Sequence, residues 1–266
     1  MVTTYLDKIL AVHRSAAAVD TRDLEQLIER AKACAPTRGF RNALLRARPS
    51  ADNGLGVIAE IKRRSPSKGD LNPGIDAAEW AAAYQSGGAT CLSVLTDRDH
   101  FGGSPDDLVA ARGAVSIPVI RKDFTVNARD VVDARLMGAD AVLLIVAALD
   151  QVELADFHQL ALELGLDALV ETHDEPEVER ALAVGADLIG VNQRDLVTFE
   201  VDTARAVRVG QSLPEHVVRV AESGVGGPED AGPLAAAGYH AVLVGESLVR
   251  SGDPSAAVAA LRAVTG

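Results

Sequence analysis

A glutamate and a lysine share one face of a short apolar segment near residue 60. Glu60 and Lys62 lie two positions apart in the run VIAEIKRRSPSKG, which covers residues 57–69. Because side chains alternate across a β-strand, these two would point one way and Val57, Ala59 and Ile61 the other. Two charges on the covered face of a buried strand would carry a large desolvation penalty. The segment therefore predicts a charged, hydrated pocket at the carboxyl end of this strand.

Lysine is rare in this chain, and its placement suggests proton transfer. The lysines are Lys8, Lys32, Lys62, Lys68 and Lys122, and arginine supplies the other basic side chains. Arginine stays protonated in proteins, whereas the pKa of a lysine can be tuned by its surroundings. Lys62 and Lys122, at expected strand ends, are therefore candidate acids or bases. The alternative is that these lysines are left by chance in an arginine-biased composition.

Polar or ionisable side chains end six of the eight strands that we expect. These endings are Glu60–Lys62, Arg121–Phe124, Val170–Glu171, Val191–Asp195, Ala221–Gly224 and Val244–Ser247. The active site of a parallel barrel lies at the carboxyl ends of its strands, so the six endings would meet there. One of them could be a solvated loop, but six that converge indicate a functional site.

Glycine-rich segments follow the last two expected strands. They read SGVGG at residues 223–227 and GES at residues 245–247, where a short helical turn opens. Glycine lets backbone N–H groups approach an anion, and a helix N-terminus adds a favourable dipole. The pattern predicts a phosphate site, although many unrelated phosphate-binding barrels share it.

Alternating strands and helices after residue 57 would position these groups. The expected strands are Val57–Lys62, Thr90–Leu95, Pro118–Asp123, Ala141–Val146, Ala168–Glu171, Leu188–Asn192, Val217–Glu222 and Ala241–Gly245. The alanine-rich helices between them often end at glycine, which can adopt the left-handed conformation that closes a helix. Eight such units predict an α/β fold, the (β/α)8 TIM barrel. An open doubly wound sheet is the alternative, but the chain has neither a GxGxxG turn nor a P-loop.

Residues 1–48 show helical periodicity and no chemical motif. We expect two helices separated near Asp20-Thr21, an end at Ala35-Pro36 and a short helix from Phe40. A structural cap is the favoured role, and covering the substrate is the alternative. The domain prediction is one barrel domain over residues 1–266, with residues 1–48 as its N-terminal helical extension.

Composition excludes several classes of partner. The net charge of −12 argues against a nucleic-acid or anionic-membrane surface, although a local cation cluster can still bind an anionic substrate. The longest apolar run, residues 141–149, is far shorter than the roughly 20 residues of a membrane span. No signal peptide is evident, and Cys34 and Cys91 have no metal-ligand spacing. We therefore expect a cytoplasmic protein without a metal site.

Six segments, in order, carry a family resemblance: AEIKRRSPSKG, PVIRKDF, ALVETHDE, IGVNQRDL, AESGV and VLVGESL. With them the chain resembles the indole-3-glycerol phosphate synthase family of tryptophan biosynthesis over essentially its whole length. The resemblance implies a carbon–carbon lyase that converts 1-(2-carboxyphenylamino)-1-deoxyribulose 5-phosphate to indole-3-glycerol phosphate with loss of CO2 and water. It implies no metal and no organic cofactor, and a small-molecule phosphosugar as substrate. We expect a monomer, with association with other tryptophan-pathway enzymes left open.

The resemblance also implies a role for each matching residue. Lys122 would be the general acid, Glu171 the base, and Lys62 would lie near substrate oxygen and carboxylate. The other implied catalytic residues are Asn192, Glu60 and Glu222, of which the two glutamates would hold the lysines and the substrate hydroxyls. The implied substrate contacts are Ser65 and Arg194 for polar and anionic groups, Phe124, Leu143 and Leu196 for the anthranilate ring, and Ser223, Gly224, Gly245 and Glu246 for the phosphate.

Burial and the carboxylates would act on the lysines in opposite directions. Carboxylates favour the ammonium form, whereas burial and the second lysine oppose it, so we expect a lysine pKa near its working range. Glu246, where some family members have serine, would be unfavourable beside a phosphate unless its side chain turns away and only its N–H faces the anion.

Other residues have weaker patterns. The histidines lack paired ligand spacing, and His173 is expected on the opposite strand face from Glu171. The charged loop 97–104 is either a lid or a solvent loop, and Trp80 and Tyr84 are expected in the core.

Two other functions remain as alternatives. Phosphoribosylanthranilate isomerase is a related barrel enzyme, but its Cys/Asp acid–base pair has no counterpart at a strand end here. A non-catalytic phosphometabolite-binding barrel would need cations but no base.

Overall fold

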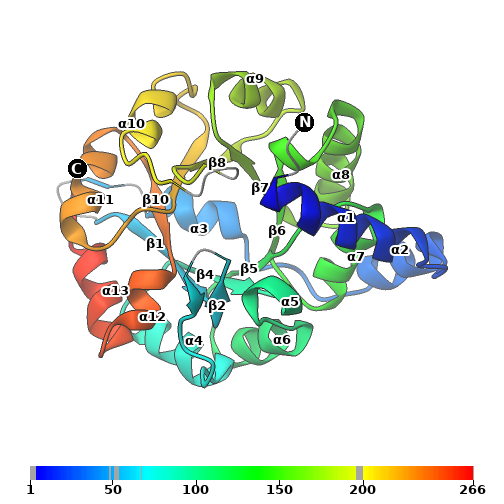
Figure 1. The fold of residues 1–266 in the computed structure, drawn as a ribbon, viewed down its shortest axis with the longest axis horizontal. Helices are drawn as coiled ribbons and strands as arrows, with labels where there is room; N and C mark the ends of the chain where they lie inside the picture. The colour runs from blue at the N-terminus through cyan, green and yellow to red at the C-terminus, as the bar shows by residue number, and fades with distance from the viewer. Residues whose placement is uncertain (1–3, 48, 51–53, 67, 196–199, 266) are drawn as a thin grey trace.

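The structure is a computed structural model that describes residues 4–47, 49–50, 54–66, 68–195 and 200–265. Its described part contains a closed barrel of parallel strands, seen end-on in Figure 1. The barrel strands are β1 (Gly56–Ile61), β4 (Cys91–Leu95), β5 (Val119–Lys122), β6 (Ala141–Ile145), β7 (Asp167–Thr172), β8 (Leu188–Asn192), β9 (Val218–Glu222) and β10 (Ala241–Val244). Each strand pairs with the next along the chain, and β1 pairs with both β4 and β10, which closes the ring. The predicted (β/α)8 TIM barrel is confirmed.

The strands are buried along nearly their whole length because helices cover them outside and side chains fill the interior. Every residue of β1, β4, β6, β8 and β10 is buried. Such strands read as continuous apolar runs, which is the sequence signal for a parallel sheet covered on both faces. Each predicted strand is present with its ends shifted by at most one residue, and Leu188–Asn192 matches at both ends.

Helices of the outer ring separate the strands. They are α4 (Ala77–Ser86), α6 (Pro105–Ala114), α7 (Ala128–Leu136), α8 (Gln151–Glu163), α9 (Glu175–Ala183), α10 (Arg205–Gly210), α11 (Pro228–Ala236) and α13 (Pro254–Arg262). Several begin with a side chain that accepts a hydrogen bond from the first turn, as Asp76 and Asp150 do. Gly88 and Gly138, predicted as helix stops, have φ values of 89° and 88°, a conformation that few other residues accept.

Short elements lie between the carboxyl ends of the strands and the helices. They are β2 (Arg64–Ser65), β3 (Gly69–Asp70), α5 (Arg98–Phe101), the 3₁₀ turn η1 (Val146–Ala148) and α12 (Glu246–Arg250). The β2–β3 hairpin was not predicted, because two polar residues per strand give no alternating apolar pattern. The loop 97–104 contains α5, whose first turn is capped by Asp97.

The N-terminal extension runs from the mouth of the barrel to its base. It consists of α1 (Tyr5–Ala18), α2 (Leu24–Lys32) and α3 (Phe40–Arg46), and Figure 1 shows α3 across the barrel centre with α1 and α2 beside α7 and α8. Phe40 and Leu44 are fully buried, so α3 closes the end at which the strands begin. Asp167, the first residue of β7, accepts a hydrogen bond from the Arg41 N–H. Helix α3 of the extension therefore closes the base of the barrel.

Within the described ranges, no helix combines the length and the apolar character needed to cross a bilayer.

Candidate active site

A cavity of about 550 Å³ opens at the carboxyl ends of the strands. It is lined by the predicted site residues Glu60, Lys62, Ser65, Lys122, Phe124, Leu143, Glu171, Asn192, Arg194, Glu222, Ser223, Gly224, Gly245 and Glu246. Leu196, the remaining predicted residue, lies outside the described residues. Strand ends that are far apart in sequence thus share one cavity, as the barrel topology requires.

Lys62 and Glu60 form a close ion pair on one side of the cavity. Lys62 Nζ lies 2.6 Å from Glu60 Oε1, and Ser93 on the neighbouring strand donates a 3.2 Å hydrogen bond to Glu60 Oε2. Burial of Glu60 would raise the pKa of its carboxyl, but Lys62 and Lys122 outweigh burial and hold that pKa below its usual value. The carboxylate is therefore ionised and fixes the lysine beside it.

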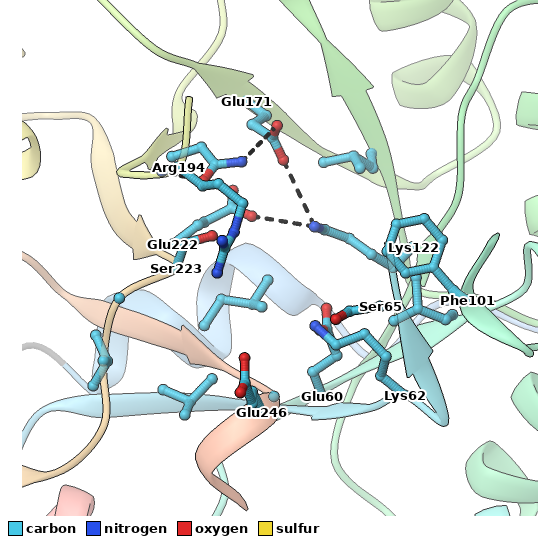
Figure 2. A pocket seen from close by; sticks show the side chains of 18 of the residues that line it. Glu60, Lys62, Ser65, Phe101, Lys122, Glu171, Arg194, Glu222, Ser223 and Glu246 are labelled. Carbon is cyan, nitrogen blue, oxygen red and sulfur yellow. Dashed lines mark hydrogen bonds and ion pairs between the residues drawn. The ribbon is translucent and has the colours of Figure 1, made fainter. Parts of the chain in front are cut away.

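Lys122 lies across the cavity between two other carboxylates. Its Nζ is 3.4 Å from Glu222 Oε2 and 3.6 Å from Glu171 Oε2 (Figure 2). Burial lowers the pKa of Lys122, yet Glu222, Glu171 and Glu60 together raise it above its usual value. The expectation of a pKa near the working range is thus wrong for the free enzyme, because three carboxylates outweigh burial. Lys122 is an ammonium group before substrate arrives.

Glu171 and Glu222 have opposite protonation tendencies although they share Lys122. Burial and the charges of Glu171 and Glu60 raise the pKa of Glu222 to about 8, against the effect of Lys122. Burial also acts to raise the pKa of Glu171, but Lys122, His173 and a 3.1 Å hydrogen bond from Asn192 hold it below its usual value. The two carboxyls therefore titrate as a coupled pair beside Lys122, and Glu222 is the member that favours its protonated form.

Two glycines leave room for these carboxylates. A Cβ at Gly190, on β8, would lie 2.1 Å from Glu222 Oε1, and a Cβ at Gly245 would lie 2.6 Å from Glu60 Oε1. Both distances are far shorter than any real carbon–oxygen contact, so a side chain at either position would displace a cavity carboxylate. Gly245 therefore has a packing role besides its expected place at the phosphate.

The predicted phosphate side lies at β9 and β10. Ser223 and Gly224 have positive φ values of 66° and 76°, which turn the chain sharply at the end of β9. Glu246, the first residue of α12, lines the cavity, and its Oε1 lies 3.4 Å from Nε of Arg250. Figure 2 places Glu246 on the opposite rim from Glu171. The paired arginine offsets the glutamate charge that seemed unfavourable from sequence, and Arg250 is a lining cation that sequence reasoning missed.

Apolar side chains form the third side of the cavity. Phe124 and Leu143 were predicted there, and Leu95, Phe101, Ile145 and Leu243 join them. The rings of Phe101 and Phe124 lie with centroids 6.2 Å apart. Phe101 belongs to the loop 97–104, whose placement after a strand was the only signal for it. A flat aromatic group would fit this wall.

His173 lies beside Glu171, contrary to expectation. Its Nε2 is 3.7 Å from Glu171 Oε1, and its Nδ1 is 3.0 Å from Glu177 Oε2. The prediction of opposite faces was wrong because residues two apart on an extended chain share a face. Thr172 takes the other face, where its hydroxyl donates to the Gly190 carbonyl.

His13, Asp97 and Asp123 form a cluster whose donor atoms could reach a common metal ion. Each already has protein partners, however: His13 bonds Asp97 at 3.0 Å, and Asp123 contacts Thr96 and Arg121. The cluster is explained by ion pairing between α1 and the barrel mouth. Trp80 and Tyr84 pack edge to face as expected, and the Tyr84 hydroxyl donates to the Glu60 carbonyl.

Comparisons with known proteins agree with this geometry. The family model described as indole-3-glycerol phosphate synthase matches residues 5–261. A protein of that name from Mycolicibacterium smegmatis is 52% identical over 97% of this chain and 93% of its own length. Another from Kineococcus radiotolerans is 50% identical over 97% of this chain and 94% of its own length.

A solved structure shares the fold at low sequence identity. Thiamine phosphate pyrophosphorylase from Pyrococcus furiosus superposes with a TM-score of 0.61 at 17% identity, covering 79% of this chain and 95% of that one. This likeness concerns the barrel alone. The whole-length family match and the two relatives decide the assignment: the chain belongs to the indole-3-glycerol phosphate synthase family.

Proposed function

We propose that this chain closes the indole ring of 1-(2-carboxyphenylamino)-1-deoxyribulose 5-phosphate by lysine and glutamate acid–base catalysis, releasing CO2 and water. As a family member it is a carboxy-lyase of tryptophan biosynthesis. The observation that carries the mechanism is the position of Lys122, whose Nζ lies 3.4 Å from Glu222 Oε2 and 3.6 Å from Glu171 Oε2. An acid and a base thus stand within reach of one substrate.

The cavity has a polar end and an apolar end that suit the two ends of this substrate. The glycine-lined turns after β9 and β10, with Arg250 nearby, would receive the phosphate. Phe124 and Leu143 would receive the carboxyphenyl ring. The ketone in the middle of the substrate would then face Lys122.

The proposed steps balance in atoms and protons. The ring carbon that bears the carboxylate attacks the ketone carbon, and Lys122 protonates the ketone oxygen as the new carbon–carbon bond forms. The carboxylate leaves as CO2, and its bonding electrons restore the aromatic ring. The new hydroxyl then accepts a second proton from Lys122, which Glu222 has reprotonated, and leaves as water. Glu171 takes a proton from the methylene carbon of the newly formed ring, which completes the indole.

Glu222 and Lys62 would support these transfers. Lys122 is a weak acid in the free enzyme because its pKa is raised. A proton on Glu222, whose pKa is about 8, can replace the one that Lys122 gives up. Lys62, 2.6 Å from Glu60, would bind the substrate carboxylate and a hydroxyl. Asn192 would keep Glu171 oriented through its hydrogen bond to Oε1.

The decisive experiment is an assay with that substrate, in which indole absorbance and fluorescence report ring closure. We expect turnover by the wild type and its loss in Glu171→Gln, which keeps the shape and removes the base. Full ring closure by that variant would move the base elsewhere. No product from the wild type would reject the synthase.

The isomerase alternative has no support in the described part of the chain. Cys91 begins β4, at the opposite end of the barrel from the cavity, and Cys34 follows α2 in the extension. Neither can form an acid–base pair in the cavity.

We further propose that the enzyme works in the cytoplasm, as a monomer, on a small-molecule phosphosugar, without cofactor, metal, nucleic acid or membrane.

A further inference from the structure

His173 is a partly buried imidazole placed between the candidate base and an outer carboxylate. Glu177 lies in the first turn of α9, and its Oε2 accepts a 2.8 Å hydrogen bond from the His173 backbone N–H. The same oxygen lies 3.0 Å from His173 Nδ1. The opposite ring nitrogen, Nε2, is buried, has no hydrogen-bond partner in the described structure, and lies 3.7 Å from Glu171 Oε1. A small shift of either side chain would bring these two atoms into hydrogen-bond contact.

We propose that His173 is a positioning residue for Glu171: Glu177 fixes the imidazole through Nδ1, and the cationic ring keeps the Glu171 carboxylate ionised and aimed at Lys122. The role rests on the proposed function of Glu171 as the base. It accounts for the place of the unpartnered Nε2, which faces the Glu171 carboxylate at 3.7 Å.

The charges around His173 support a cationic ring. The described groups that act on it are Glu177 from α9, Glu171 from β7 and Glu222 from β9, and all three are acidic. Burial lowers the pKa of His173, but the hydrogen bond with Glu177 and these charges raise it above its usual value. His173 in turn contributes to the lowered pKa of Glu171, after burial and Lys122.

Glu171 then has a separate partner on each side. Lys122 faces Oε2 at 3.6 Å, while Asn192 and His173 face Oε1 at 3.1 and 3.7 Å. When Lys122 gives up its proton, Glu171 loses one cation. His173 would remain as the second, so the carboxylate stays a base at the stage that needs one.

The first test measures the protonation of His173 without any assay. Histidine-labelled wild type is titrated by NMR, and the His173 signal is identified by its absence in His173→Gln. We expect titration above 6.5, and a lower value in both Glu171→Gln and Glu177→Gln, because each removes a facing carboxylate. A measured His173 pKa at or below 6.5 that is the same in the wild type and in both variants would overturn the proposal, whatever the activity.

The second test uses the pH profile of kcat. An opposite charge at this distance typically lowers a carboxyl pKa by about 1–3 units. We therefore expect the acid limb in His173→Gln to move upward by about one unit, so that kcat falls more at pH 6 than at pH 8 while KM changes little. Glu177→Gln should shift the limb the same way by less. The double variant should match His173→Gln, because Glu177 acts through His173.

His216→Gln is the control, since His216 is exposed and lies far from the cavity lining. An acid limb in His173→Gln identical to that of the wild type would reject the positioning role. If His173→Gln does not fold, the histidine signal that shifts in both Glu171→Gln and Glu177→Gln identifies His173, and Glu177→Gln supplies the pH profile. Absence of synthase activity in the wild type would reject the proposed function. The NMR titration would then still test the contact between His173 and Glu171.

Discussion

The side chain of Lys122 shows how a residue acquires its chemistry from its neighbours. The same lysine on an exposed helix would be one of many cations, but here it lies within 3.6 Å of two buried carboxylates. Their pKa values shift in opposite directions: burial and neighbouring anions raise that of Glu222 to about 8, whereas Lys122, His173 and Asn192 hold that of Glu171 below its usual value. The cavity therefore has an acid and a base ready at the same pH.

Removing Lys122 should abolish most turnover. We expect Lys122→Ala to fold and to lose about 10²–10⁴-fold in kcat, the usual contribution of a positioned acid. The matched control is Lys32→Ala on α2, where the lysine pairs with exposed Glu29. Circular dichroism and the indole assay would measure folding and activity. A kcat near that of the wild type in Lys122→Ala would contradict the acid assignment.

The proton on Glu222 should set the alkaline side of the pH profile. Its pKa is raised to about 8, so the carboxyl is neutral below that pH and becomes a further buried anion above it. We expect wild-type kcat to fall as pH rises through about 8. Glu222→Gln, which imitates the neutral carboxyl, should retain residual activity without this decline. A decline of the same shape in Glu222→Gln would assign it to another group.

At the level of elements, the strands bring the site together and the glycines beside them make space. Gly190 contributes no chemical group, but its missing Cβ admits Glu222 into the cavity. A strand glycine normally weakens a sheet, so this one is retained for the close approach.

Gly190→Ala should therefore damage the site more than the fold. The new Cβ would lie 2.1 Å from Glu222 Oε1 and would force that carboxylate away from Lys122. We expect kcat to fall at least tenfold with only a modest decrease in melting temperature. Gly232→Ala on α11 is the control, because its Cβ meets nothing within 4 Å. Equal kcat in both variants would show that Glu222 can relocate freely.

Sequence patterns predicted the strands well because each is a short apolar run between clear helix stops. They also predicted the polar part of the cavity lining, since barrel topology dictates where polar strand ends meet. The apolar part, Phe124 and Leu143, was implied by the family resemblance. They missed Arg250 and Phe101, which enter from short elements with no periodic signal. The protonation states could not be predicted from sequence for a physical reason. The pKa of Lys122 depends on its distances from three carboxylates, which no spacing along the chain encodes.

For the whole molecule, the extension links the mouth of the barrel to its base. His13 on α1 bonds Asp97 at 3.0 Å, and Arg14 pairs with Glu153 on α8 at 2.7 Å. The His13 ring also lies 5.3 Å from the Phe124 ring, which lines the cavity. The docking of α1 therefore touches the proposed ring-binding wall directly.

This docking should weaken at alkaline pH. Burial lowers the pKa of His13, but Asp97, Asp123 and Asp130 raise it above 6.5. His100 contacts the same Asp97 carboxylate, with Nδ1 3.1 Å from Oδ2. A raised pKa in the folded state stabilises α1 fully below about pH 6.5 and loses that effect as pH rises through the folded value.

Hydrogen–deuterium exchange, corrected for intrinsic rates, would measure the effect. We expect peptides of α1 to lose protection between pH 6 and pH 8.5, while peptides of α13 change little. His13→Gln should remove the difference. Equal protection of α1 at both pH values in the wild type would contradict the role of His13.

The pairing of β1 with β10 has a consequence for synthesis of the chain in the cell. Glu60 and Lys62 are synthesised with the first strand of the barrel. Gly245 packs against that pair but follows the last barrel strand, so it is synthesised much later. Until β10 reaches β1, the nascent polypeptide has no complete rim on which to hold a substrate. Catalytic competence should consequently appear in a single step, once β10 has left the ribosome and paired with β1, and chains that stop before β10 should be inert.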